Sequence, residues 1–209
     1  MLKILIPENK QHFQDAASIF AELYEAVTGN VLEIIRQDDP CSDLICFGTD
    51  ADSVLIYQWM MDKKIPNFSI CYGTDSYQIL SATIDQRKVL FLTGGNVRAS
   101  FYAVYDFFER AAGCHWFWDG DRIPKAEHIS IDGWDVQETP RFEYRGLRYF
   151  AHRGLMRFQA EHWDFEDWKK EFDWVLKKRL NLAMLRIGVD DLFQQAFPQV
   201  VSYPDWKKP

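Results

Sequence analysis

The chain has 209 residues, of which 47% are hydrophobic and 26% are charged, so it can bury a sizeable core in one large or two small domains. Its net charge of −7 and its lack of a dense lysine or arginine run argue against nucleic acid or an anionic membrane as a partner. No segment of the sequence approaches the roughly 20 consecutive apolar residues that a membrane-spanning helix requires.

Apolar spacing, turn residues and capping residues predict alternating strands and helices through about residue 136. In chain order we expect a strand over 2–6, a helix over 11–28, strands over 31–35 and 44–47, a helix capped by Asp52 or Ser53 and ending near 63, a hairpin of 77–84 with 89–93, a helix over 97–112, and strands over 114–118 and 128–131. This order favours an α+β domain with helices on one face of a mostly antiparallel sheet.

Gly94, Gly95 and Asn96 directly precede the helix that ends at Gly113. A glycine turn at a helix N-terminus can cradle a phosphate. This one lacks the G-x-G-x-x-G spacing and the lysine of a P-loop. We therefore interpret it as a helix-capping turn.

The segment from Pro140 to Asp191 predicts one βαβ unit. Strand-like runs over 144–150 and 180–187 flank a helix that Asp164 caps and whose apolar residues recur at three- and four-residue spacing. A right-handed crossover through that helix makes the two strands parallel.

The same segment carries a sequence signature, because residues 140–146 read PRFEYRG and residues 179–181 read RLN. These motifs resemble the start of the catalytic barrel in the β-N-acetylhexosaminidases, the α-N-acetylglucosaminidases and the α-glucuronidase-like hydrolases. Residues 90–125, LFLTGGNVRASFYAVYDFFERAAGCHWFWDGDRIPK, resemble the end of the non-catalytic α+β domain that precedes the barrel in those families.

The resemblance implies a hexosaminidase-like accessory domain over 1–136 and the start of a truncated (β/α)8 barrel over 137–209. It implies part of a glycoside hydrolase that cleaves O-glycosyl bonds, in an N-acetylglucosaminide or a uronide. In those families the catalytic acids lie on later barrel strands, so we assign no catalytic residue here and interpret Asp190 and Asp191 as helix-capping anions. The alternative is a non-catalytic α+β module that binds a glycan or another protein.

Side chains at or near the ends of the two barrel-like strands are the candidates for binding substrate, namely Arg145, Arg148, His152 and Arg186. Arg145 matches the arginine that hydrogen-bonds sugar hydroxyls in the hexosaminidases, and its fork of donors suits a vicinal diol. The other interpretation, an arginine paired with a structural carboxylate, is equally open. Phe150 and residues 184–186 depart from the hexosaminidase pattern, which argues against an N-acetylhexosamine substrate but not against the barrel.

The sequence contains no metal-binding spacing, so we expect no metal and no cofactor. Trp116, Phe117 and Trp118 could stack on a sugar, but core or interdomain packing is the favoured interpretation. For partners we expect carbohydrate, no nucleic acid and no membrane, together with self-association through the edges of the truncated barrel segment. The opening MLKILIPENK is not a signal peptide, which suggests the cytoplasm unless a leader has been removed.

Overall fold

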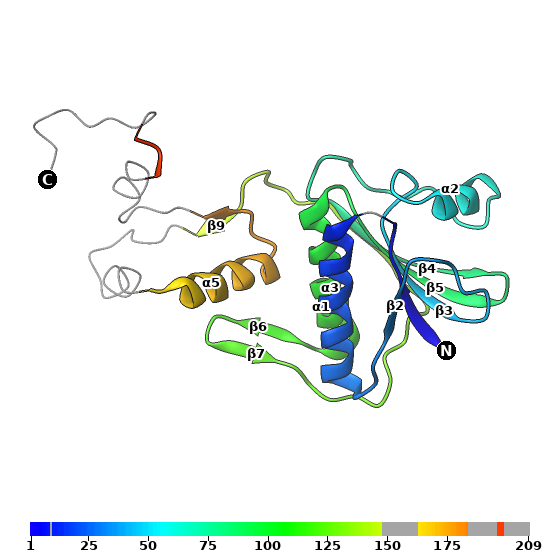
Figure 1. The fold of residues 1–209 in the computed structure, drawn as a ribbon, viewed down its shortest axis with the longest axis horizontal. Helices are drawn as coiled ribbons and strands as arrows, with labels where there is room; N and C mark the ends of the chain where they lie inside the picture. The colour runs from blue at the N-terminus through cyan, green and yellow to red at the C-terminus, as the bar shows by residue number, and fades with distance from the viewer. Residues whose placement is uncertain (9, 148–162, 184–195, 199–209) are drawn as a thin grey trace, which may run out of the picture. The chain divides into compact units, whose positions relative to one another are not determined.

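A computed structural model describes residues 1–8, 10–147, 163–183 and 196–198. The chain divides into two compact units. The first comprises Met1–Glu143 with Leu176–Arg179, and the second comprises Tyr144–Val175 with Leu180–Pro209. Figure 1 shows the fold of both units, with helices and strands labelled where there is room.

The first unit is built on a six-stranded mixed sheet with the strand order β2-β1-β3-β5-β4-β8. β1, β2, β3 and β5 are parallel, whereas β4 is antiparallel to β5 and to β8. The strands of this sheet are β1 (Leu2–Leu5), β2 (Glu33–Ile35), β3 (Asp43–Phe47), β4 (Tyr77–Ile84), β5 (Arg87–Gly94) and β8 (Asp135–Glu138). A separate hairpin is formed by β6 (His115–Phe117) and β7 (Gly120–Arg122).

The fold is α+β, but the expectation of a mostly antiparallel sheet is wrong. Parallel neighbours require a long crossover connection. The helix α1 (Gln11–Thr28) supplies one, because it returns the chain from the end of β1 to the start of β2. The choice of parallel partners depends on which strands meet in space, and local sequence patterns do not report it.

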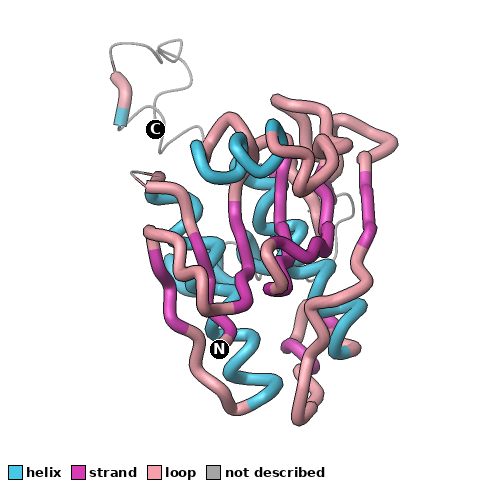
Figure 2. The backbone as a smooth tube through the Cα atoms, turned by 90° about the vertical axis from the view of Figure 1, so that its right-hand side faces the viewer, coloured by secondary structure: helices cyan, strands magenta, loops and turns pink. Residues whose placement is uncertain are grey.

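The expectation of helices on one face is also wrong, because helices cover both faces of the sheet. α1 and α3 (Val97–Ala112) lie side by side on one face (Figure 1), behind the sheet when it is viewed from the side of α2 (Val54–Met61; Figure 2). Successive strand residues alternate accordingly: Ile45 joins the core beneath α1 and α3, and Leu44 joins the core beneath α2. Burial on both faces explains why residues 44–47 of β3 form a continuous apolar run.

The predicted ends of the long helices are confirmed. α1 and α3 each end at a glycine in the left-handed conformation, Gly29 and Gly113, with φ of 77° and 66°. The side chain of Asn96 caps α3 by accepting from Ala99 N at 3.0 Å, and Ser53 caps α2 by accepting from Ile56 N at 3.4 Å. Within the described residues, no helix combines the length and the apolar character needed to cross a membrane.

The glycine turn before α3 allows close backbone packing. A Cβ on Gly94 would lie 2.5 Å from Ser100 N, and one on Gly95 would lie 2.2 Å from Cys71 O. Gly95 N also donates to Ser76 O at 2.7 Å, so this amide is already used. These contacts support the interpretation as a capping turn rather than a phosphate cradle.

The strand expected over 128–131 is absent from the described sheet, whereas β7 and β8 were not expected. Ile129 and Ile131 are buried, as their apolar character suggested, but they lie in a loop. The Ser81 hydroxyl on β4 donates to Ile131 O at 2.6 Å. The backbone pairing with β4 begins later, at β8. The prediction was wrong because residues 128–131 are partly buried without being paired to a neighbouring strand.

In the second unit, β9 (Gly146–Leu147) and β10 (Leu182–Ala183) pair in parallel, and α5 (Phe165–Lys177) separates them in sequence. Asp164 caps α5 as expected, because its Oδ1 accepts from Asp167 N at 3.0 Å. The predicted parallel βαβ unit is thus confirmed. Residues 144–145 and 180–181 of the expected strands do not belong to β9 or β10, and residues 148–150 and 184–187 lie outside the described residues.

An ionic cluster in the first unit is centred on Asp106 of α3, whose side chain is almost fully buried. Its Oδ2 lies 2.9 Å from Arg110 Nε, and its Oδ1 lies 3.6 Å from Arg179 Nη1. Arg179 Nη2 also donates to Glu109 at 2.7 Å. The cluster therefore holds residues 176–179 against α3.

The same carboxylate reaches the sheet. Tyr77 on β4 is 3% exposed, and burial, together with the charge of the Asp106 carboxylate, raises the pKa of its phenol. Leu176 packs against the core formed by α1, α3 and the sheet. One buried carboxylate thus links a helix, a strand and a segment about 70 residues later in the chain.

Replacing Asp106 by alanine should lower the free energy of unfolding by about 3 kcal/mol. The substitution leaves the guanidinium groups of Arg110 and Arg179 without the carboxylate that neutralises them. Because both groups are partly exposed, the loss of stability lies at the lower end of the range for broken buried pairs. Urea unfolding at neutral pH measures it. The matched control is Asp132→Ala, which breaks the exposed pair with Lys88 and should cost less than about 1 kcal/mol. Equal losses in the two variants would show that Asp106 has no special structural role.

Candidate functional site

Arg145, the strongest sequence-predicted site residue, immediately precedes β9. Its backbone is clasped by Asn181: Arg145 N donates to Asn181 Oδ1 at 2.8 Å, and Asn181 N donates to Arg145 O at 2.8 Å. Leu182 N donates to the same carbonyl at 3.0 Å. The signature residues Arg145 and Asn181 therefore lie together, and they fix where the two parallel strands begin to pair.

Gly146 in the same signature permits the close approach of the strands. A Cβ there would lie 2.4 Å from Leu182 O and 2.9 Å from Leu182 Cβ. Arg148, His152 and Arg186 lie outside the described residues, as do Asp190 and Asp191. A substrate-binding role for these arginines and this histidine stays a prediction.

The aromatic residues of the β6–β7 hairpin divide between core and surface. Trp116 is fully buried and packs edge to face against Tyr105, with ring centroids 5.3 Å apart. Phe117 and Trp118 are 52% and 56% exposed. The predicted core role holds for Trp116, and the two exposed rings leave a surface that an apolar partner or a sugar face could contact.

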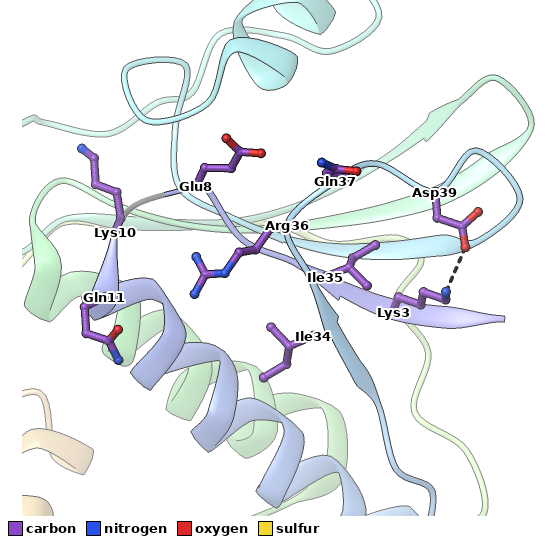
Figure 3. A pocket seen from close by; sticks show the side chains of 9 residues that line it. All are labelled: Lys3, Glu8, Lys10, Gln11, Ile34, Ile35, Arg36, Gln37 and Asp39. Carbon is purple, nitrogen blue, oxygen red and sulfur yellow. Dashed lines mark ion pairs between the residues drawn. The ribbon is translucent and has the colours of Figure 1, made fainter.

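The structure places a further group of residues together at the carboxyl ends of β1, β2 and β3, where sequence reasoning proposed no site. Two adjoining cavities open there, of about 950 and about 420 Å3, and both are lined by Glu8, Arg36 and Gln37. The larger is drawn in Figure 3. β1 is the strand at which the chain order reverses, with β2 on one side and β3 on the other, and ligands of open α/β sheets bind outside such a position.

The sequence contains a signal for this site, namely charged residues after three successive strands. The signal indicates a site only if the three strands are known to be parallel. Charged residues follow the ends of β1, β2 and β3 within three positions, as Glu8, Arg36 and Asp50. In an antiparallel sheet these strand ends would lie at opposite edges. Because the three strands are parallel, their carboxyl ends meet at one edge.

Most charged groups of the two cavities are already paired. Lys3 Nζ lies 2.9 Å from Glu33 and 3.0 Å from Asp39. Lys10 Nζ donates to Asp52 Oδ1 at 2.9 Å, closing the gap between the start of α1 and the loop after β3. These ion pairs form part of the walls of the two cavities, and both lysine side chains are already neutralised by carboxylates.

Asp39 is the lining acid with the most perturbed titration. A hydrogen bond from the Ser42 hydroxyl at 2.7 Å, one from Cys41 N at 3.1 Å and the neighbouring Lys3 together lower its pKa to about 2. The folded state thus favours the carboxylate. Its stabilising contribution is fully present above pH 3.8 and is lost as pH falls through about 2.

Among the described residues, no group of three or more histidine, cysteine, aspartate or glutamate side chains could hold a metal ion. The two cavities are lined by polar side chains such as Gln37 and by apolar ones such as Ile35 and Leu55.

The Asn181 clasp predicts a change in local backbone stability. Asn181→Ala removes the side-chain acceptor of Arg145 N, so the exchange of this amide should accelerate by about tenfold, the equivalent of ~1 to 1.5 kcal/mol. Hydrogen exchange followed by NMR measures it. Asn67→Ala, at an exposed loop position, should leave the rate unchanged. Unchanged exchange of Arg145 in Asn181→Ala would contradict the clasp.

The contacts of Asp39 predict how its pKa changes when one hydrogen-bond donor is removed. Ser42→Ala removes the nearest donor, so the pKa of Asp39 should rise from about 2 toward 3.8. The carboxyl carbon chemical shift followed by NMR between pH 1.5 and pH 6 is the measurement, with the range set by roughly two units on either side of those values. Ser69→Ala, at an exposed serine, serves as the control and should leave the pKa near 2.

No known protein-family profile matches the chain. Among curated proteins, α-N-acetylglucosaminidase of Homo sapiens is 23% identical over 126 residues, which are 60% of this chain and 16% of that protein. Among solved structures, a family GH115 4-O-methyl-α-glucuronidase with specificity for decorated arabinogalactans aligns with a TM-score of 0.57 and 16% identity, over 86% of this chain and 24% of that chain. A Streptomyces plicatus β-hexosaminidase aligns with a TM-score of 0.43 and 12% identity, over 68% of this chain and 23% of that chain.

This chain therefore spans only 16% of the curated relative and 24% of the glucuronidase chain. The glucuronidase shares the fold over most of the present chain, and the match to the human enzyme is distant and partial. Together with the signature residues around Arg145 and Asn181, these likenesses confirm the relationship to glycoside hydrolases that the sequence motifs indicate.

Proposed function

We propose that this chain is the N-terminal part of a glycoside hydrolase, with an accessory α+β domain over 1–136 and the start of a (β/α)8 barrel over 137–209. The observation that carries the proposal is the fold shared with a glucuronidase over 86% of the chain. The sequence match to an α-N-acetylglucosaminidase over 126 residues supports the same class.

The second unit supports the barrel part of the proposal through its topology. A (β/α)8 barrel repeats a parallel strand, a helix and the next parallel strand. β9, α5 and β10 have this order, and their pairing starts at the signature residues Arg145 and Asn181. The active site of such a barrel forms beyond the carboxyl ends of its strands, which here lead toward residues 148–152 and 184–186.

The proposed reaction is hydrolysis of an O-glycosyl bond in an N-acetylglucosaminide or a uronide. The two relatives are named for activity on an N-acetylglucosaminide and on a glucuronide, and this motivates the choice of substrates. Hydrolysis requires two carboxyl groups about the scissile bond, or one acid with help from the substrate. We place these acids on later barrel strands outside this chain, and assign substrate hydroxyls to Arg145, Arg148, His152 and Arg186, whose side chains carry hydrogen-bond donors.

A second candidate function is a glycan-binding or protein-interaction module without hydrolysis. The exposed rings of Phe117 and Trp118 on the β6–β7 hairpin favour it, because aromatic faces stack on the apolar faces of sugars and on protein partners. This function needs no barrel and no catalytic acid.

The proposal predicts that this chain alone has no glycosidase activity, because the catalytic acids lie outside it. The assay is hydrolysis of aryl N-acetylglucosaminides, glucuronides and hexosides by the purified 209-residue chain. A barrel-containing glycosidase active on the same panel is the positive control. Turnover that survives repurification and disappears in Asp190→Asn or Asp191→Asn would contradict the placement of the acids.

Reading the coding sequence beyond Pro209 separates the two candidate functions. The hydrolase proposal expects about 200 further residues with six more βα repeats, since a full barrel takes about 250. A protein that contains them should hydrolyse one of the aryl substrates, and Arg145→Ala should raise its KM. A stop codon directly after Pro209 would favour the module.

A further inference from the structure

The smaller cavity at the carboxyl ends of β1 and β3 is used neither by the barrel signature nor by the proposed reaction. Its volume of about 420 Å3 lies within the range of small-molecule sites. The floor is apolar and comes from β1, β3 and the first turn of α2, including Leu5, Phe47 and Leu55. Polar side chains line the rest of it.

The cationic groups near this cavity are already engaged. Arg36 Nη2 donates to Gln14 Oε1 at 3.1 Å, and Arg36 Nη1 donates to Pro7 O at 3.4 Å. Lys10 is paired with Asp52, and Arg87 forms two hydrogen bonds with the lining residue Asp38, at 2.6 and 2.8 Å. An anionic ligand would have to break one of these pairs, and would meet the lining carboxylates of Glu8, Asp38 and Asp52.

Two polar groups of the cavity have unused hydrogen-bonding capacity. Within the described part of the chain, neither the Glu8 carboxylate nor the Gln37 amide has a hydrogen-bond partner. Figure 3 shows both groups on the side of the sheet edge that faces α2, whereas the Arg36 guanidinium points toward α1. A carboxylate accepts hydrogen bonds, and an amide both donates and accepts them.

We propose that this crevice binds a neutral polyhydroxylated ligand of monosaccharide size. The ligand hydroxyls donate to Glu8 and exchange hydrogen bonds with Gln37, and one C–H face of the ring packs on the apolar floor next to Val54 and Leu55. The site belongs to the first unit alone and is separate from the predicted barrel site. It rests on the proposed function only in the choice of sugars as probes.

The groups present favour this class over a cation. The described residues include no cluster that could hold a metal ion, and Glu8 is the one lining carboxylate of this cavity that has no partner among them. A single exposed carboxylate in water attracts a cation only weakly. The neighbouring amide and apolar floor instead match a hydroxylated ring, which buries its C–H groups and directs hydroxyls to the rim.

The test is an NMR titration of the 209-residue chain with N-acetylglucosamine, glucosamine and glucuronate, which are neutral, cationic and anionic. We expect saturable shifts with N-acetylglucosamine at amides of residues 5–8, 35–37 and 52–56, and weaker binding of glucuronate. Glu8→Ala should weaken the binding of N-acetylglucosamine at least about tenfold, as expected for the loss of a hydrogen bond to a charged group. Gln37→Ala should weaken the binding less.

The matched control is Gln11→Ala, which lines only the larger cavity and whose amide donates to Asp15. It should leave the affinity unchanged. Glu8 and Gln37 are exposed, so their variants are expected to fold.

The proposal is overturned by a lack of saturable shifts with N-acetylglucosamine, by an unchanged affinity in the Glu8→Ala, Gln37→Ala double variant, or by tighter binding of glucosamine than of N-acetylglucosamine. A longer protein that hydrolyses glycosides while this crevice binds no sugar would refute the crevice and leave the proposed function intact. Sugar bound here in a protein without hydrolase activity would do the reverse.

Discussion

The buried carboxylate of Asp106 is the interaction on which the first unit depends most. It lies on α3, accepts from Arg110 one turn later, lies 3.6 Å from Arg179 and helps to raise the pKa of Tyr77 on β4. A carboxylate with so little exposure is tolerated only when cations and donors surround it. Its position therefore constrains a helix, the sheet and the segment 176–179 at once.

That position follows from how α3 is placed on the sheet. Gly94 and Gly95 let the chain leave β5 and enter α3 with the backbone in close contact with Cys71 and Ser100. Beyond this turn, the apolar face of α3 packs against α1, and Phe20 of α1 contacts Phe107 and Phe108 at ring distances of 5.4 and 4.9 Å. A dense aromatic layer of this kind transmits small displacements, so the ionic cluster and the glycine turn depend on the same packing.

The parallel strands of the first unit have a consequence for function that a mostly antiparallel sheet would not have. They direct Glu8, Arg36 and the loop before α2 to one edge, where two cavities meet. The second unit repeats the principle on a smaller scale, because β9 and β10 are parallel and both lead toward the predicted barrel site. The first unit, which lacks the barrel-like signature around Arg145 and Asn181, thus has cavities at the carboxyl ends of its parallel strands.

The local sequence determined the elements whose ends are set by neighbouring residues. The helices over 11–28 and 97–112 were predicted with their observed ends, because glycines in the left-handed conformation and an asparagine cap act within one turn. The βαβ unit around Arg145 and the relationship to glycoside hydrolases were also visible, since each signature motif is a short run of adjacent residues, 140–146 and 179–181. Only the tertiary structure decided the order of β2, β1, β3 and β5, the packing of α2 on the face opposite α1 and α3, and the presence of Glu8 and Gln37 in one cavity. These features arise from contacts between residues far apart in the chain, and hydrophobic periodicity reports which residues are buried but not which strand or helix buries them.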